Sequence, residues 1–152
     1  MLNRSDVENF WTRGDIHSRV HKAMSEAGLN DKKLEIEDLF PIDQYHARGI
    51  AATVDLGKRM PISENQTIID IGCGLGGPAR YFAKQFKCFI TGIDITPSFI
   101  EIGNKFNKLT SMSKQVSLQI GNGETLDFDD ETFDGGYSQH VTMNIKNRKD
   151  FF

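Results

Sequence analysis

The stretch that decides the fold is Thr67-Ile-Ile-Asp-Ile-Gly-Cys-Gly-Leu-Gly-Gly-Pro-Ala-Arg-Tyr-Phe-Ala83. It opens with a short β-branched apolar run, which is typical of a parallel strand covered on both faces. Gly72, Gly74 and Gly77 then have the spacing of a nucleotide-binding turn between a strand and a helix. Pro78 fits the start of that helix, and the apolar residues after it recur at helical spacing. The stretch therefore predicts a strand, a glycine turn and a helix.

Two acidic residues indicate what such a turn would bind. Asp70 precedes the first glycine by two positions, and Asp94 closes a second apolar run about 20 residues beyond the turn. An acid in the place of Asp94 accepts hydrogen bonds from ribose hydroxyls, and we expect its replacement to change folding little. A carboxylate in the place of Asp70 repels a pyrophosphate and attracts a sulfonium or ammonium group. The pattern favours S-adenosylmethionine over NAD, and a strand–turn–helix without a ligand remains the alternative.

Composition limits the classes of protein further. The 152 residues, 38% of them hydrophobic, are enough for one domain with a core. A net charge of −3 predicts no broad attraction to nucleic acid or to an anionic membrane. The two cysteines lie in segments that we expect to be buried, and no apolar run reaches spanning length. We therefore expect a cytoplasmic protein with no nucleic-acid or membrane partner.

Other segments have a readable periodicity. An apolar stripe that includes Ile16, Val20 and Met24 predicts helix within residues 5–27, with Asp15 as a cap. We predict a short helix over 31–38 and another along the stripe from Ala47 to Val54. Beyond the glycine turn, a helix is expected from Pro97, a third strand over 115–120 and a fourth over 133–138.

The two acidic motifs also resemble a known family. Ile-Ile-Asp-Ile-Gly-Cys-Gly-Leu-Gly-Gly, followed by Thr91-Gly-Ile-Asp-Ile95, resembles the first two motifs of the class I S-adenosylmethionine-dependent methyltransferases. The resemblance implies that Asp70, Gly72 and Gly74 hold the amino-acid end of the cofactor and that Asp94 holds the ribose. It places Cys73, Gly77 and Ile95 among the cofactor-binding residues as well.

A second resemblance lies upstream, in Asp43-Gln-Tyr-His-Ala-Arg-Gly49. It is similar to the Asp-Gln-aromatic-His-x-x-Gly segment of the sarcosine/dimethylglycine methyltransferases. The resemblance implies a lid over the methionine end of the cofactor, with Gln44 and Tyr45 as cofactor-binding residues. Arg48 departs from the glycine that those relatives usually carry. The alternative is that Asp43 caps a helix and Tyr45 is half-buried.

The segment after the third predicted strand, Gly121-Asn-Gly-Glu-Thr-Leu-Asp-Phe128, resembles the family pattern Gly-Asp-Ala-x-x-Leu-Pro-Phe. In the family, the acid and the following N–H group contact the adenine amino edge. The resemblance implies that Asn122, Gly123 and Glu124 lie at the adenine. Asn122 replaces the acid, and its side-chain oxygen still accepts a bond from an amino group. A Gly-Asn-Gly turn without a ligand is the alternative.

The end of the fourth predicted strand resembles the place where the family presents the methyl group. Ser138-Gln139 match the dimethylglycine-type pattern, and Gln139 is expected to bind the cofactor. His140 and Asn144 stand where the family has an acid and a histidine. Any proton removal from the acceptor would fall to His46 or His140. A polar strand-end role for His140 remains open.

These observations lead to one main hypothesis. The fold is α/β, a partial doubly wound Rossmann-like parallel sheet of strand order 3-2-1-4 with N-terminal helices. Residues 1–60 form a helical cap and 61–152 the N-terminal half of an S-adenosylmethionine-binding domain. The function is methyl transfer to a small-molecule acceptor, an amine being one candidate, with no metal site. The alternatives are a cofactor-binding module without turnover and a nicotinamide-dependent oxidoreductase.

The family continues beyond the last residue of this sequence, so we expect a truncated chain without turnover. Its fourth strand would then be an exposed sheet edge, through which we expect self-association.

Overall fold

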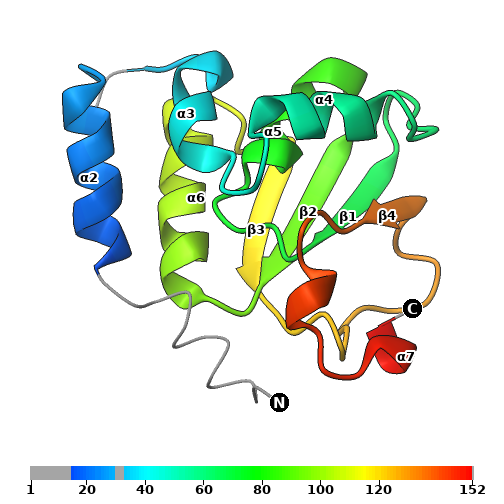
Figure 1. Cartoon of the computed structure of the whole chain (residues 1–152). Coiled ribbons are helices and arrows are strands. Elements are labelled where there is room, and N and C mark those ends of the chain that lie inside the picture. Colours follow the sequence, from blue (N-terminus) through cyan, green and yellow to red (C-terminus); the bar gives the residue numbers. More distant parts are fainter. Residues whose placement is uncertain (1–14, 30–32, 152) are drawn as a thin grey trace.

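The core of the protein is a sheet of four parallel strands in the order β3-β2-β1-β4 (Figure 1). The computed structural model describes residues 15–29 and 33–151. The strands are β1 (Thr67–Ile71), β2 (Phe89–Asp94), β3 (Val116–Ile120) and β4 (Gly135–Tyr137). The α/β class and the predicted strand order are confirmed. The fourth strand is shorter than the predicted range 133–138.

The strand order reverses at β1, which pairs with β2 on one side and β4 on the other. Asp70 on β1 lies opposite Gly92 on β2 and Tyr137 on β4. In open parallel sheets the ligand crevice lies outside the carboxyl ends of the strands at such a reversal. The topology therefore predicts a ligand site at the loops that follow β1, β2 and β4.

Two helices cover one face of the sheet. They are α5 (Gly77–Phe86), which follows the glycine turn, and α6 (Pro97–Leu109). Phe82 of α5 and Ile100 of α6 belong to one buried cluster with the sheet residues Ile68, Ile90 and Val116. Because these three strand residues are aligned in register, their side chains share a face. The helix predicted after the glycine turn and the helix predicted from Pro97 are both confirmed.

The first described helix, α2 (Ile16–Glu26), packs on the outer side of α6 (Figure 1). The Asp15 carboxylate accepts a hydrogen bond from the backbone N–H of His17 at 3.0 Å and so caps the helix. Ile16, Val20 and Met24 are buried in a cluster with residues of α6. The predicted cap and stripe are confirmed, whereas the part of the prediction over 5–14 lies outside the described residues.

Two helices predicted in the N-terminal third have other bounds in the structure. Of the helix predicted at 31–38, residues 31 and 32 lie outside the described residues, and 33–35 are not helical. The chain instead forms a 3-10 helix, η1 (Ile36–Leu39), that continues into α3 (Phe40–Asp43). Pro41 lies in the first turn of α3, where a missing N–H is tolerated. The helix predicted from Ala47 is α4 (Ile50–Gly57), which buries Thr53 and Gly57.

The start of α4 has a backbone cause. Arg48 (φ 68°) and Gly49 (φ 51°) both have positive φ, so the helix cannot include them. This delays the helix to Ile50, whereas the predicted stripe began at Ala47. Gly57 then meets the Phe82 ring so closely that an added Cβ would lie 2.9 Å from Cε1 of the ring.

The remaining described elements follow β4. They are η2 (Thr142–Asn144) and the short helix α7 (Arg148–Phe151), which carries the chain back to the loop after β3. No helix within residues 15–29 and 33–151 is both long and apolar enough to span a bilayer.

Candidate functional site

A cavity lies at the carboxyl ends of β1, β2 and β4, where the strand order reverses. Its walls come from the glycine turn, the end of β2, the loops after β3 and β4, and the residues Asp43, Tyr45 and His46. Most of the residues predicted for the site line this cavity, namely Tyr45, His46, Asp70, Gly72, Cys73, Gly74, Asp94, Ile95, Asn122, Gly123, Glu124, Gln139 and His140. The topology therefore gathers residues that are spread over nearly 100 positions.

The glycine turn has a backbone that few other residues could adopt. Gly72 and Gly74 have φ of 81° and 54°. A Cβ on Gly72 would lie 2.3 Å from Cγ2 of Val141, whereas a Cβ on Gly74 would meet no atom within 4 Å. Gly74 therefore presents bare backbone to the open cavity, and Gly72 is covered by the loop after β4.

The backbone donors of this turn are used within the protein. The N–H groups of Gly72 and Cys73 both donate to the carbonyl of Ile93, at 2.8 and 3.0 Å. The N–H of Gly74 donates to Oδ2 of Asp94 at 2.9 Å. A phosphate-binding turn needs such groups free and directed at the ligand. The bare backbone of this turn permits a ligand to approach closely. Its three amides are already bonded within the protein, so they are not available to a phosphate.

Asp70 is a buried carboxyl at the base of the cavity. Its side chain is 2% exposed, and Oδ2 accepts a hydrogen bond from the Tyr137 hydroxyl at 2.8 Å. Burial raises the pKa of Asp70 to about 7, and the nearby Asp94 carboxylate contributes in the same direction. The group is thus poised between its neutral and charged forms, and a cation in the cavity would favour the charged form.

Asp94 fixes the backbone around the cavity. In addition to the bond from Gly74, Oδ1 accepts a bond from the N–H of Thr96 at 2.9 Å. Burial raises the pKa of Asp94, which these bonds partly offset. Because two backbone donors depend on this carboxylate, the structure leads us to expect that its loss lowers stability, in contrast to the expectation from the sequence.

Three predicted residues are buried in the wall of the cavity or behind it. The Cys73 thiol packs against Gly92, and burial raises its pKa. Gln44 is buried and accepts a bond from the Thr53 hydroxyl at 2.6 Å. Gly77 permits close packing, since a Cβ there would lie 2.5 Å from the carbonyl oxygen of Asp43. Gln44 and Gly77 do not line the cavity.

The loop after β3 has an internal hydrogen bond that the sequence did not reveal. Oδ1 of Asn122 accepts a bond from the N–H of Glu124 at 3.0 Å, so the oxygen expected to face adenine already has one partner. Oε1 of Glu124 in turn accepts a bond from the N–H of Asn147 at 2.8 Å. These bonds join the loop to the segment before α7.

The two predicted catalytic histidines lie face to face. The rings of His46 and His140 are parallel to within 3°, with centroids 5.1 Å apart. Burial lowers the pKa of His46. Its Nδ1 lies 3.2 Å from the carbonyl oxygen of Ala47, and a proton on Nδ1 would leave Nε2 as an acceptor. The fold therefore unites two candidates that are distant in sequence.

Sequence reasoning missed several cavity residues. Val141 covers Gly72, and Ile145 and Lys146 line the cavity, although no motif marked them. Phe99 also lines it and packs edge-on against Tyr45, with ring centroids 6.1 Å apart. Phe99 stands at an apolar position of α6, which indicates core packing alone. Only its contact with the exposed Tyr45 distinguishes it, and that contact is visible only in the structure.

Comparison with known proteins gives a consistent result. Residues 69–152 match the family model described as "Methyltransferase domain". A sterol 24-C-methyltransferase of Debaryomyces hansenii is 33% identical over 89 residues, which are 59% of this chain and 24% of that protein. Phosphoethanolamine N-methyltransferase 1 of Arabidopsis thaliana is 26% identical over 119 residues, 78% of this chain and 24% of that protein. The chain thus spans about a quarter of the length of these relatives.

A solved structure matches almost the whole chain. It is phosphoethanolamine N-methyltransferase 2 of Haemonchus contortus in complex with phosphomonomethylethanolamine and S-adenosylhomocysteine. The TM-score is 0.73 at 18% identity, and the match covers 99% of this chain and 32% of that one. This likeness supports the Rossmann-like fold.

Proposed function

Because the chain belongs to the methyltransferase domain family, we propose that it binds S-adenosylmethionine for methyl transfer to a small-molecule acceptor. The observation that carries the proposal is the cavity at the strand reversal, with the bare backbone of Gly74, the buried Asp70 and Asp94 on its walls. Asp70, Gly72 and Gly74 would hold the amino-acid end, Asp94 the ribose, and Asn122 with Gly123 the adenine. In this proposal residues 1–60 are the cap and 61–152 the cofactor-binding part.

The hydrogen bonds of the glycine turn favour this cofactor over a nicotinamide dinucleotide. Three consecutive N–H groups, from Gly72 to Gly74, are bonded to β2 and to Asp94, so they do not receive a pyrophosphate. Asp70 and Asp94 would repel such a group when charged. A ligand with a sulfonium and an ammonium group would instead gain from both carboxylates.

The residues of the cavity would position the reactants and handle a proton. When bound, the cofactor supplies an already activated methyl group on its sulfonium. Tyr45 and His46, on the segment between α3 and α4, would close over this group and exclude water. We assign proton acceptance to His46, because burial lowers its pKa and so favours the neutral ring, which can take up a proton. His140 would hold the ring of His46 in place by stacking.

Substrate class and location belong to the same proposal. The relatives are named for sterols and phosphoethanolamine, which are both small molecules. We therefore assign a small-molecule acceptor to the protein, and an amine is the candidate that the sequence motifs favour. Cys73 and Cys88 are both free and buried, which suits a reducing cytoplasm.

A labelled-methyl assay tests this function. The protein, given labelled cofactor and a panel of amines, phosphoethanolamine and sterols, should transfer label to one class. His46→Gln should then lower turnover without weakening cofactor binding, because the ring is proposed to act on the acceptor. Binding without transfer to any acceptor would favour the alternative of a cofactor-binding module.

A further inference from the structure

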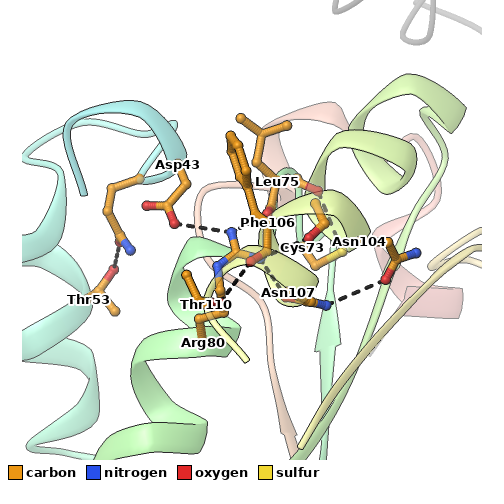
Figure 2. A network of polar contacts seen from close by, with 12 residues as sticks. Asp43, Thr53, Cys73, Leu75, Arg80, Asn104, Phe106, Asn107 and Thr110 are labelled. Carbon is orange, nitrogen blue, oxygen red and sulfur yellow. Dashed lines mark hydrogen bonds and ion pairs between the residues drawn. The ribbon is translucent and has the colours of Figure 1, made fainter. Parts of the chain in front are cut away.

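A buried arginine connects two walls of the cavity without lining it. Arg80 of α5 is fully buried and donates hydrogen bonds to four acceptors. Figure 2 shows its guanidinium between Asp43 on one side and Asn107 on the other. The distances are 3.1 Å to Oδ2 of Asp43 and 2.6 Å to Oδ1 of Asn107. The other two acceptors are the carbonyl oxygens of Gly103 and Leu75.

Two of these acceptors belong to the site. Leu75 lies in the glycine turn, and Asp43 ends α3 immediately before the segment that carries Tyr45 and His46. Both Asp43 and Leu75 line the cavity, whereas Arg80 does not. The guanidinium therefore connects the glycine turn to residues 43–46, which we call the cap segment. Asn107 connects the same guanidinium to α6.

Stability alone does not require this arrangement. Taking a charged pair out of water is costly, and well-packed apolar residues of similar volume often give equal or greater stability. What apolar residues cannot supply is fixed direction. The planar guanidinium reaches several acceptors at once, and a lysine ammonium cannot reproduce that fork. The residue type thus fits a role in holding three segments at set positions.

We propose that Arg80 is a positioning residue of the cofactor site, which sets the cap segment against the glycine turn through Asp43 and Leu75. The inference rests on the proposed function, because its readout is cofactor binding. Gly77 supports it, since only a glycine there lets the Asp43 carbonyl approach α5. A lost link would let the cap and the turn move apart.

The same helix offers a matched control. Lys84 of α5 forms a surface ion pair with Glu37 of η1, with 2.8 Å between Nζ and Oε1. This pair also joins α5 to the segment before α3, but neither residue lines the cavity. Lys84→Met therefore removes a charged contact between the same parts of the chain without touching the proposed link.

The experiment measures the dissociation constant for S-adenosylhomocysteine and the thermal midpoint of four proteins: the wild type, Arg80→Lys, Arg80→Met combined with Asp43→Asn, and Lys84→Met. Arg80→Lys keeps the charge beside Asp43, and the double variant leaves no unpaired charge, so at least one should fold. In each folded Arg80 variant the constant should rise about tenfold or more, because small misplacements in a site are costly. For Lys84→Met it should stay within about twofold.

The results decide whether Arg80 positions the cofactor site or only stabilises the fold. If the Arg80 variants melt earlier but bind with the wild-type constant, the role is structural and the proposal is overturned. The same holds if Lys84→Met weakens binding as much as the Arg80 variants do. A wild-type protein that does not bind S-adenosylhomocysteine would contradict the proposed function instead, so the two failures are distinguishable.

Discussion

Asp94 couples the stability of the glycine turn to ligand binding. Asp94→Ala should lower the free energy of unfolding by about 1–3 kcal/mol, because the N–H groups of Gly74 and Thr96 lose their acceptor. It should also weaken cofactor binding by roughly 1.5–3 kcal/mol, the range for hydrogen bonds to a charged group. Denaturant unfolding and titration with S-adenosylhomocysteine measure the two effects. Unchanged affinity would show that Asp94 serves only the turn.

Asp70 should make stability depend on pH. Its pKa is about 7 in the folded protein against 3.8 for a free side chain, so between these values the folded state holds a proton that the unfolded chain has lost. The free energy of unfolding should therefore fall as the pH rises through this window. Asp70→Asn keeps an acceptor for the Tyr137 hydroxyl and should remove this contribution. Parallel pH profiles for the two proteins would contradict the assignment.

Single site residues could be predicted where a residue type with distinctive chemistry stands at a motif's spacing. Asp70, Asp94 and the glycines stood out because acids and glycines are informative beside a buried strand. His46 and His140 were also found, but their stacking was not, because it depends on how two loops meet. Val141 and Lys146 have no sequence signal, since an aliphatic or a lysine after a strand is common. The ion pair between Arg80 and Asp43 could not be predicted either, because nothing in the sequence distinguishes these two residues from the other charged residues.

At the scale of elements, substitutions at two glycines of the turn should affect stability and ligand binding to different degrees. Gly74→Ala adds a methyl group that meets no atom within 4 Å, so the cost should be only the left-handed strain of about 1–2 kcal/mol. The methyl group would project into the cavity and should weaken S-adenosylhomocysteine binding about tenfold, or ~1.4 kcal/mol. Gly72→Ala should destabilise the protein more, since its Cβ would collide with Val141.

Gly28 provides the control for this prediction. It has φ of 69° with nothing near an added Cβ, and it lies after α2, away from the cavity. Gly28→Ala should cost similar strain and leave the dissociation constant unchanged. If Gly28→Ala and Gly74→Ala affect binding equally, the open space beside Gly74 is not where the ligand lies.

The helices show what periodicity can and cannot predict. The helices α5 and α6 were predicted correctly because their buried residues recur at helical spacing, although those of α6 pack against α2 as well as against the sheet. The helix α4 was misplaced because Arg48 and Gly49 adopt positive φ, which a pattern of apolar residues does not reveal. The short helix predicted at 31–38 was also displaced, because helical structure begins at η1 and continues into α3, where Pro41 lies in the first turn.

At the scale of the whole molecule, one sheet edge is formed by the short strand β4. Within the described residues β4 pairs with β1 alone, so its other side presents unpaired backbone groups. Such an edge favours pairing with another chain. We predict that the 152-residue chain associates as its concentration rises, which light scattering at several concentrations would detect. A monomer at all concentrations would contradict this prediction.

The strand order could be predicted because the topology follows from two successive strand–helix–strand units and a reversal. The site followed from the topology, since loops at the carboxyl ends of β1, β2 and β4 must meet. What remained hidden is how the segment before α4 is held against the turn. That depends on the buried network around Arg80, in which the bonds to Asp43, Gly103 and Asn107 join residues far apart in sequence (Figure 2).

The most direct test of the account is a calorimetric titration of this protein with S-adenosylhomocysteine and, separately, with NADH. The account predicts saturable one-site binding of S-adenosylhomocysteine that weakens in Asp94→Ala, and no binding of NADH. At a hundredfold excess over its dissociation constant the ligand should stabilise the fold by about 2.7 kcal/mol. Equal binding of NADH, or no binding of S-adenosylhomocysteine by the folded protein, would contradict the central claim.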